Sequence, residues 1–248
     1  MKIFPNIVPI VKLMNSVGKY GTHKRMIDSA KARGDFDEER KWILDATSTF
    51  GKNVMASFGC DIHVHGGENI PDEGPVVIMA NHQGYADIPA LFSVFDKFQI
   101  GFVAKVGLGK VPVLKTWLPR TRSIFIDNSD PRASLETIKL GVKYIEDGFS
   151  LAICPEGTRS HGPQMGPFTP GAMKLATKPG VPIIPVAING TYKTFEETGV
   201  LKGARIDIKI FPPMETAGIS HKDEKLMFRE IEKIIGDGVA ELVLLQDE

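Results

Sequence analysis

Cysteine is scarce in this sequence of 248 residues, which contains only Cys60 and Cys154. Two cysteines fall far short of a disulfide framework, and no pair of Cys-x-x-Cys motifs predicts a zinc site, so a reducing compartment is the expected setting. His63 and His65 stand two positions apart, but side chains with that spacing on a strand merely share a face. Without an accompanying cluster of carboxylates or cysteines, we expect these histidines to be structural and to hold no metal.

The N-terminal region lacks an apolar run long enough to cross a bilayer. Its longest charge-free stretch, residues 3–11, has nine residues and two prolines, whereas a membrane-spanning helix needs about 20 apolar residues. No Ala-x-Ala-like cleavage site follows, which argues against a secretory signal. Residues 3–17 and 35–58 instead show the periodicity of amphipathic helices. We therefore expect residues 1–59 to form a two-helix segment before a main domain of residues 60–248, either covering that domain or lying on a membrane surface.

The chain has no excess of charge of either sign, because 30 basic residues balance 30 acidic ones. A net charge of zero argues against nucleic acid as a partner, but the charges are unevenly distributed. Residues 1–27 and 97–126 contain lysines and arginines and no acid, whereas acids outnumber bases from Glu196 onward. This distribution favours contact between the basic segments and an anionic membrane surface, with residues 1–59 as the anchor.

Short apolar runs alternate with helix-like segments from residue 61 onward, and 42% of the residues are hydrophobic, which is ample for a core. Such alternation predicts an α/β fold with a central, largely parallel sheet flanked by helices. Ligands of these folds bind at the carboxyl ends of the strands. The runs expected to be strands are IHV, PVVIMA, IGFVAK, SIFID, SLAIC, VPIIPVAI and RIDIKIF.

The stretch NHQGYAD places His82 and Asp87 five positions apart at the end of an apolar run. On a single helix or strand this spacing separates two side chains, so they can meet only if the backbone turns between them. The preceding run, Gly84 and the following apolar segment predict such a strand–turn–helix. His23 and Asp28 have the same spacing but lie in a charged, helix-like stretch without a turn, where we expect a solvated helix residue.

A second informative stretch is PEGTRS, which follows the apolar run LAIC. Pro155 ends the strand, Gly157 allows close approach of the backbone to a ligand, Thr158 can donate a hydrogen bond, and the planar guanidinium of Arg159 suits a phosphate. Taken alone, the stretch is better explained as a surface turn with a contact between Glu156 and Arg159, and only the two stretches together favour an anion pocket.

Together these stretches resemble the glycerolipid acyltransferase family, which includes lysophosphatidic acid acyltransferases. NHQGYAD, SIFID, PEGTRS and VPIIPVAING occur in the order of the family's four motifs, and the resemblance covers about residues 60–200. Three positions depart from the family pattern. Arg122 stands six residues before the usual position of the arginine in the second motif, Lys105 is followed by Gly107 and Leu108 rather than Glu-Leu, and Cys154 replaces a common aromatic residue.

The resemblance implies transfer of a fatty acyl group from acyl-CoA or acyl carrier protein to the sn-2 hydroxyl of lysophosphatidic acid, giving phosphatidic acid at the cytoplasmic membrane face. No cofactor is expected. His82 would act as general base and Asp87 would orient its ring. Backbone N–H groups near Gly84 or Gly157 could stabilise the oxyanion, and Cys154 would be a small buried residue. The residues expected to bind substrate are Glu156, Gly157, Thr158, Arg159, Lys105 and Arg122.

Other functions fit the same motifs. Glycerol 3-phosphate or another lysolipid could be the acceptor, the chain could be a thioester hydrolase, or it could bind membrane lipid without catalysis. An intact pair of His82 and Asp87 weighs against the last of these.

Overall fold

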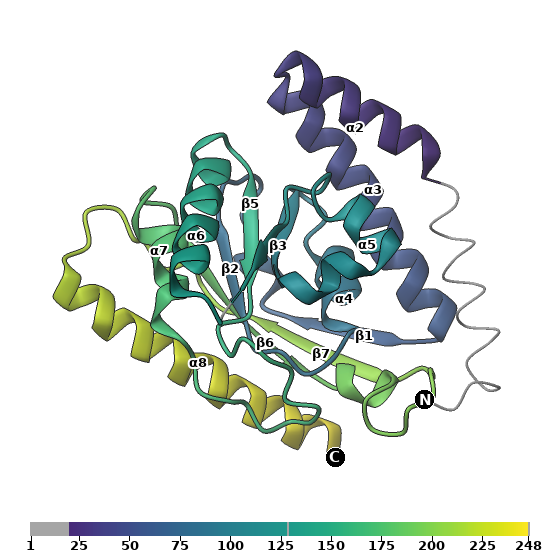
Figure 1. The fold of residues 1–248 in the computed structure, drawn as a ribbon. Helices are drawn as coiled ribbons and strands as arrows, with labels where there is room; N and C mark the ends of the chain where they lie inside the picture. Colours follow the sequence, from purple (N-terminus) through teal and green to yellow (C-terminus); the bar gives the residue numbers. More distant parts are fainter. Residues whose placement is uncertain (1–19, 128, 248) are drawn as a thin grey trace.

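The computed structural model describes residues 20–127 and 129–247, and its arrangement is that of a mixed sheet between layers of helices (Figure 1). The first amphipathic helix expected from the sequence, residues 3–17, lies outside the described residues. No helix among the described residues is long and apolar enough to cross a bilayer.

The seven apolar runs form the seven strands of one sheet, in the order β1-β7-β6-β2-β5-β3-β4. All neighbouring pairs are parallel except β6 and β7, so the expected largely parallel sheet is confirmed. The strand β2 lies between β5 and β6, near the middle of the sheet. The strands are β1 (Asp61–His65), β2 (Val77–Ala80), β3 (Ile100–Lys105), β4 (Ile124–Ile126), β5 (Ser150–Ile153), β6 (Ile183–Asn189) and β7 (Arg205–Ile210).

Alternate residues of each central strand pack on opposite faces of the sheet. In β2, Ile78 and Ala80 join the hydrophobic cluster under α3 and α4, whereas Val77 and Met79 join the cluster under α6, α7 and α8. A strand covered on both faces is apolar at every position, which explains why the sequence shows an unbroken run rather than alternation. The helices are α2 (Gly21–Arg33), α3 (Phe36–Phe58), α4 (Asp87–Val94), α5 (Pro112–Trp117), α6 (Pro131–Glu146), α7 (Lys174–Thr177) and α8 (His221–Asp247), with short 3₁₀ turns η1 (Gly67–Asn69), η2 (Val106–Lys110), η3 (Pro170–Met173) and η4 (Thr191–Thr194).

The helix α3 packs on the main domain along the apolar face expected from the sequence. Its N-terminus is capped by the carboxylate of Asp35, which accepts a hydrogen bond from the backbone N–H of Glu38. Val54 belongs to the core cluster shared with α4, and a side chain at Gly51 would collide with the backbone oxygen of Pro89. In the structure α3 therefore covers the main domain with this face.

Candidate active site

Three parallel strands bring the two informative stretches to one edge of the sheet. His82 follows β2, Pro155 follows β5 and Gly190 follows β6, and β2 pairs with both other strands. Because these strands are parallel, their carboxyl ends meet at the same edge, which is where such folds bind ligands. The chain turns at Gly84 and enters α4 at Asp87, as the expected strand–turn–helix requires.

His82 and Asp87 are in direct contact across this turn. The Nδ1 atom of His82 lies 2.6 Å from Oδ2 of Asp87. The Asp87 side chain is completely buried, whereas 23% of the His82 side chain is exposed. The carboxylate therefore lies under the imidazole, and the ring reaches the surface.

Hydrogen bonds around Asp87 favour one tautomer of the neutral His82 ring. Besides His82, the carboxylate accepts from the backbone N–H groups of Gln83 at 2.8 Å and Gly84 at 3.1 Å, and from the hydroxyl of Thr191. Because a carboxylate surrounded by donors can only accept, Nδ1 of His82 carries a hydrogen and donates it. In the neutral ring Nε2 is then the acceptor, which is the form that a general base needs.

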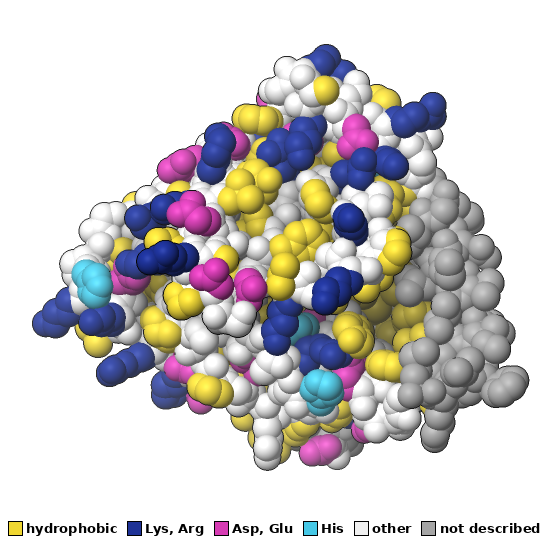
Figure 2. Space-filling view, in the orientation of Figure 1, with side chains coloured by type: hydrophobic (Ala, Val, Ile, Leu, Met, Phe, Trp, Pro, Cys, Tyr) yellow, Lys and Arg dark blue, Asp and Glu magenta, His cyan; other side chains and the backbone are white. Residues whose placement is uncertain are grey.

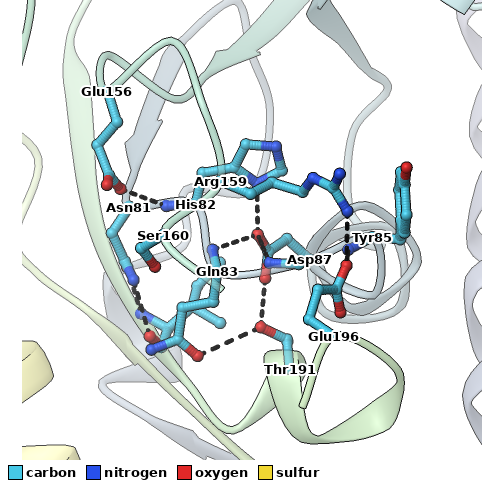
Figure 3. A network of polar contacts seen from close by, with 12 residues as sticks. Asn81, His82, Gln83, Tyr85, Asp87, Glu156, Arg159, Ser160, Thr191 and Glu196 are labelled. Atoms are coloured by element: carbon cyan, nitrogen blue, oxygen red, sulfur yellow. Dashed lines mark hydrogen bonds and ion pairs between the residues drawn. The ribbon is translucent and has the colours of Figure 1, made fainter. Parts of the chain in front are cut away.

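Thr191 belongs to a buried polar network that the sequence did not predict (Figure 3). The amide oxygen of Gln83 accepts from the backbone N–H of Gly190 at 2.9 Å, and its amide nitrogen donates to Asn189 at 3.2 Å. Asn81 pairs in both directions with the backbone of Ile188. The sequence did contain one indication of this network. A polar run follows VPIIPVAI, and this run begins at the same edge of the sheet as His82.

Glu156 holds two loops together. Its carboxylate accepts from the backbone N–H of His82 at 2.6 Å and from that of Gly166 at 2.7 Å. Burial raises the pKa of Glu156, while these two hydrogen bonds act in the opposite direction. Both oxygens are occupied and Arg159 pairs with a different acid, so the contact between Glu156 and Arg159 considered from the sequence is wrong.

Arg159 is held beside the histidine by two side chains. Its Nη1 donates to Oε1 of Glu196 at 2.8 Å, and its guanidinium carbon lies 3.7 Å from the centre of the Tyr85 ring. The loop of Arg159 is also bonded to the loop of His82: Ser160 N–H donates to the His82 carbonyl at 2.8 Å, and His161 N–H donates to the Gln83 carbonyl at 3.2 Å. The guanidinium thus has a fixed place near the imidazole (Figure 3).

Three other residues expected to bind substrate lie at this edge of the sheet. Gly157 adopts a left-handed conformation with φ of 64°, which forms the turn after β5, and Thr158 is exposed beside it. Lys105 is exposed at the carboxyl end of β3. Figure 2 shows Lys and Arg side chains among hydrophobic ones on the face that carries α5 in Figure 1.

Arg122 does not contribute to this site. Its guanidinium donates two hydrogen bonds of 2.6 Å to the carboxylate of Glu39 on α3, and both side chains are buried. The rings of Phe149 and Tyr144 lie 4.4 and 5.0 Å from its guanidinium carbon. The substrate-binding role expected for Arg122 is therefore corrected: the residue ties α3 to the segment before β4, and its donors are committed to Glu39.

The backbone N–H groups considered for the oxyanion already have acceptors. That of Gly84 donates to Asp87, and that of Gly157 donates to the carbonyl of Cys154. Burial raises the pKa of the Cys154 thiol well above its usual value, and the negative charges of Asp87 and Glu156 add to this effect. A thiolate is therefore disfavoured at residue 154, which suits a small packing residue rather than a nucleophile.

The remaining histidines singled out in the sequence have partners of their own. His23 pairs with Asp45 at 2.8 Å rather than with Asp28, which pairs with Arg120. His63 and His65 contact Asp61 and Asp207 at 2.8 and 3.0 Å. Among the described residues, no group of three or more His, Cys, Asp or Glu side chains is arranged to hold a metal ion.

Comparison with known proteins identifies relatives along the part of the chain that carries the site. The sequence model of the family described as Acyltransferase matches residues 61–189. A chloroplastic 1-acyl-sn-glycerol-3-phosphate acyltransferase of Brassica napus is 31% identical over 61% of this chain and 44% of its own length. The enzyme of that name from Saccharomyces cerevisiae is 31% identical over 77% of this chain and 62% of its own, and that from Borreliella burgdorferi is 29% identical over 67% of each.

A solved structure has the same fold. The crystal structure of the 1-acyl-sn-glycerophosphate acyltransferase PlsC from Thermotoga maritima matches with a TM-score of 0.73 and 24% identity, over 96% of this chain and 97% of the other. This chain spans less than half the length of the plant relatives. At this identity the structural likeness concerns the fold.

Proposed function

Because this chain belongs to the acyltransferase family, we propose that it transfers a fatty acyl group from an acyl thioester to the sn-2 hydroxyl of lysophosphatidic acid, giving phosphatidic acid. The relatives from Brassica napus, Saccharomyces cerevisiae and Borreliella burgdorferi bear the name 1-acyl-sn-glycerol-3-phosphate acyltransferase, which supports this acceptor. The acyl donor is acyl-CoA or acyl carrier protein, and no cofactor takes part.

In the proposed reaction His82 is the general base. Its Nε2 takes the proton of the acceptor hydroxyl as the hydroxyl oxygen bonds to the thioester carbonyl carbon. Collapse of the tetrahedral intermediate breaks the carbon–sulfur bond, and the protonated ring returns the proton to the leaving thiolate. Asp87 stabilises the charged ring through Nδ1 and keeps Nε2 directed outward. The substrate's own hydroxyl is the nucleophile, so no serine or cysteine is required.

Arg159 anchors the phosphate of the acceptor in this proposal, and Lys105 adds positive charge at the same edge of the sheet. A guanidinium can bind two phosphate oxygens in parallel, which orients the headgroup as well as attracting it. Fixing a hydroxyl against its base in this way contributes up to about 7–11 kcal/mol when positioning is ideal. Gly157 and Thr158 complete the turn that presents Arg159.

We further propose that an anionic membrane surface, on its cytoplasmic face, is where the enzyme meets its lipids. Residues 1–27 contain no acid. On the described surface, Val106, Val111 and Val113 are 52%, 41% and 40% exposed, and in the sequence they alternate with Lys105, Lys110 and Lys115. Exposed apolar groups mixed with basic ones suit the boundary between lipid headgroups and acyl chains. Binding would be peripheral or monotopic, with residues 1–59 as the anchor.

The single observation that carries the proposed function is the contact between His82 and Asp87, with the partly exposed ring of His82 in the neighbourhood of Arg159 (Figure 3). A pair of this geometry is suited to taking a proton from a hydroxyl.

The test is thiol release from acyl-CoA in the presence and absence of lysophosphatidic acid. Wild-type protein should release thiol only with the acceptor, and His82→Ala should lower the rate by roughly 10²- to 10⁴-fold, the usual contribution of a general base. His23→Ala is the matched control, since His23 has the same spacing to an aspartate but contacts Asp45. Release without acceptor would indicate a thioester hydrolase, and an undiminished rate in His82→Ala would refute the assigned base.

A further inference from the structure

Glu196 lies beside the site and has no part in the chemistry described above. It follows η4 in the loop after β6, and only 2% of its side chain is exposed. One carboxylate oxygen, Oε1, accepts from both Arg159 and the backbone N–H of Tyr85, the latter at 2.8 Å. The other oxygen, Oε2, is buried without a hydrogen-bond partner among the described residues. A buried acid with one unsatisfied oxygen is costly, which calls for a reason for its presence.

The position of Glu196 depends on the absence of a side chain at Gly84. A Cβ atom at residue 84 would lie 2.5 Å from Oε2 of Glu196. Glu196 is therefore packed directly on the turn that joins His82 to Asp87. Through this contact it links the position of Arg159 to the position of the proposed base.

The contacts of Arg159 leave part of its guanidinium available. Nη1 makes the one hydrogen bond that this guanidinium forms within the described residues, and Tyr85 covers one of its two flat faces. A two-point pair with Glu196 would have used more of its N–H groups and satisfied Oε2. The one-point contact instead leaves Oε2 without a donor. In Figure 3 Glu196 lies on one side of the guanidinium, and the other nitrogens point away from it.

We propose that Glu196 is a positioning residue for Arg159 and thereby sets the preference for phosphorylated acceptors. Glu196 holds the guanidinium at one nitrogen, Tyr85 holds it by its face, and the remaining N–H groups bind the phosphate. This inference rests on the proposed function. It goes beyond that function because it assigns the selectivity to a residue that does not touch the substrate.

The test compares Glu196→Gln with Glu197→Gln. The first change keeps an oxygen for the Tyr85 N–H but removes the charge that holds Arg159, and the second removes a neighbouring charge that pairs with Lys202 on the surface. In Glu196→Gln the KM for lysophosphatidic acid should rise roughly ten-fold or more, as expected when an anchor is displaced. Its rate with a lysolipid lacking the phosphate group should fall much less than its rate with lysophosphatidic acid. Glu197→Gln should behave as wild type.

A second variant guards against simple loss of folding. Glu196→Asp keeps the charge but shortens the side chain by one methylene, and it should give a smaller rise in KM than Glu196→Gln at a comparable melting temperature. Equal KM values in Glu196→Gln and Glu197→Gln, with active wild-type protein, would overturn the positioning role. Equal losses with both acceptors would overturn it as well. Wild-type protein inactive on lysophosphatidic acid would instead refute the proposed function.

Discussion

Thr191 holds the side of Asp87 that His82 does not touch. Its hydroxyl donates to Oδ1 of Asp87 in a fully buried position. In Thr191→Val we expect kcat to fall about ten-fold or more with little change in KM. A hydrogen bond to a charged group contributes about 1.5–3 kcal/mol, and 1.36 kcal/mol corresponds to a factor of ten in rate. Steady-state rates with saturating acceptor measure the effect.

Thr194→Val is the matched control for this prediction. Thr194 is also buried, but its hydroxyl donates to the carbonyl of Thr191 and not to Asp87. Comparable kcat values in the two variants, at comparable melting temperatures, would show that the hydroxyl of Thr191 has no part in orienting the pair.

At the scale of single residues, the sequence predicted only those site residues that lie within a recognisable motif. His82, Asp87 and Arg159 stand in short stretches whose residue types indicate their chemistry. Thr191 and Glu196 stand in the stretch INGTYKTFEETG, which reads as an ordinary polar loop. Their proximity to Asp87 and Arg159 arises because β6 pairs with β2, and that pairing of distant segments has no local signature in the sequence.

At the scale of elements, the pair of Glu39 and Arg122 connects α3 to the segment before β4. Removing one partner of a buried ion pair leaves an uncompensated charge, which destabilises proteins by about 3–5 kcal/mol. We therefore expect Glu39→Ala to lower the free energy of unfolding by that amount in urea titration. Asp37→Ala on the same helix, where the side chain is 92% exposed and pairs with Arg40, should cost no more than about 1 kcal/mol.

A double replacement separates the structural role of Arg122 from the substrate-binding role first expected. Glu39→Leu combined with Arg122→Met should recover much of the stability lost in Glu39→Ala, because no charge is left buried alone. The double variant should also keep the wild-type KM for lysophosphatidic acid. A rise in KM in this variant, without loss of stability, would show that Arg122 does bind substrate.

The positions of the strands were easier to predict from the sequence than the surface on which the amphipathic helix α3 packs. Apolar runs between turn residues identified the strands of the sheet, and the runs of β2, β5 and β6 are unbroken because strands covered on both faces are apolar throughout. The apolar face of α3 was equally clear, but a stripe of this kind packs on a protein core or on a lipid surface for the same physical reason. Only the contacts with α4, such as that of Gly51, distinguish the two.

At the scale of the whole molecule, the position of the charges matters more than their sum. Replacing the five basic residues of residues 1–27 by glutamine should weaken flotation with vesicles that contain anionic lipid, since each basic residue near such a surface contributes about 1 kcal/mol. The effect should shrink as salt is added. The five residues are Lys2, Lys12, Lys19, Lys24 and Arg25.

The acid-rich C-terminal part supplies a control with the same number and kind of charges. Replacing four lysines and one arginine there also takes the net charge from zero to five negative charges, but it should leave flotation nearly unchanged. Equal losses in the two variants would show that net charge alone governs membrane binding. The control residues, all exposed, are Lys202, Lys222, Lys225, Arg229 and Lys233.

The two backbone hydrogen bonds that join residues 160 and 161 to residues 82 and 83 have a consequence for which lipids fit. They tie the loop of His82 to the loop of Arg159, so the distance between the proposed base and the proposed phosphate anchor should be constant. Glycerol places its phosphate and its free hydroxyl on adjacent carbons. An acceptor one carbon longer should bind Arg159 with its hydroxyl out of reach of His82, and act as an inhibitor that is not acylated.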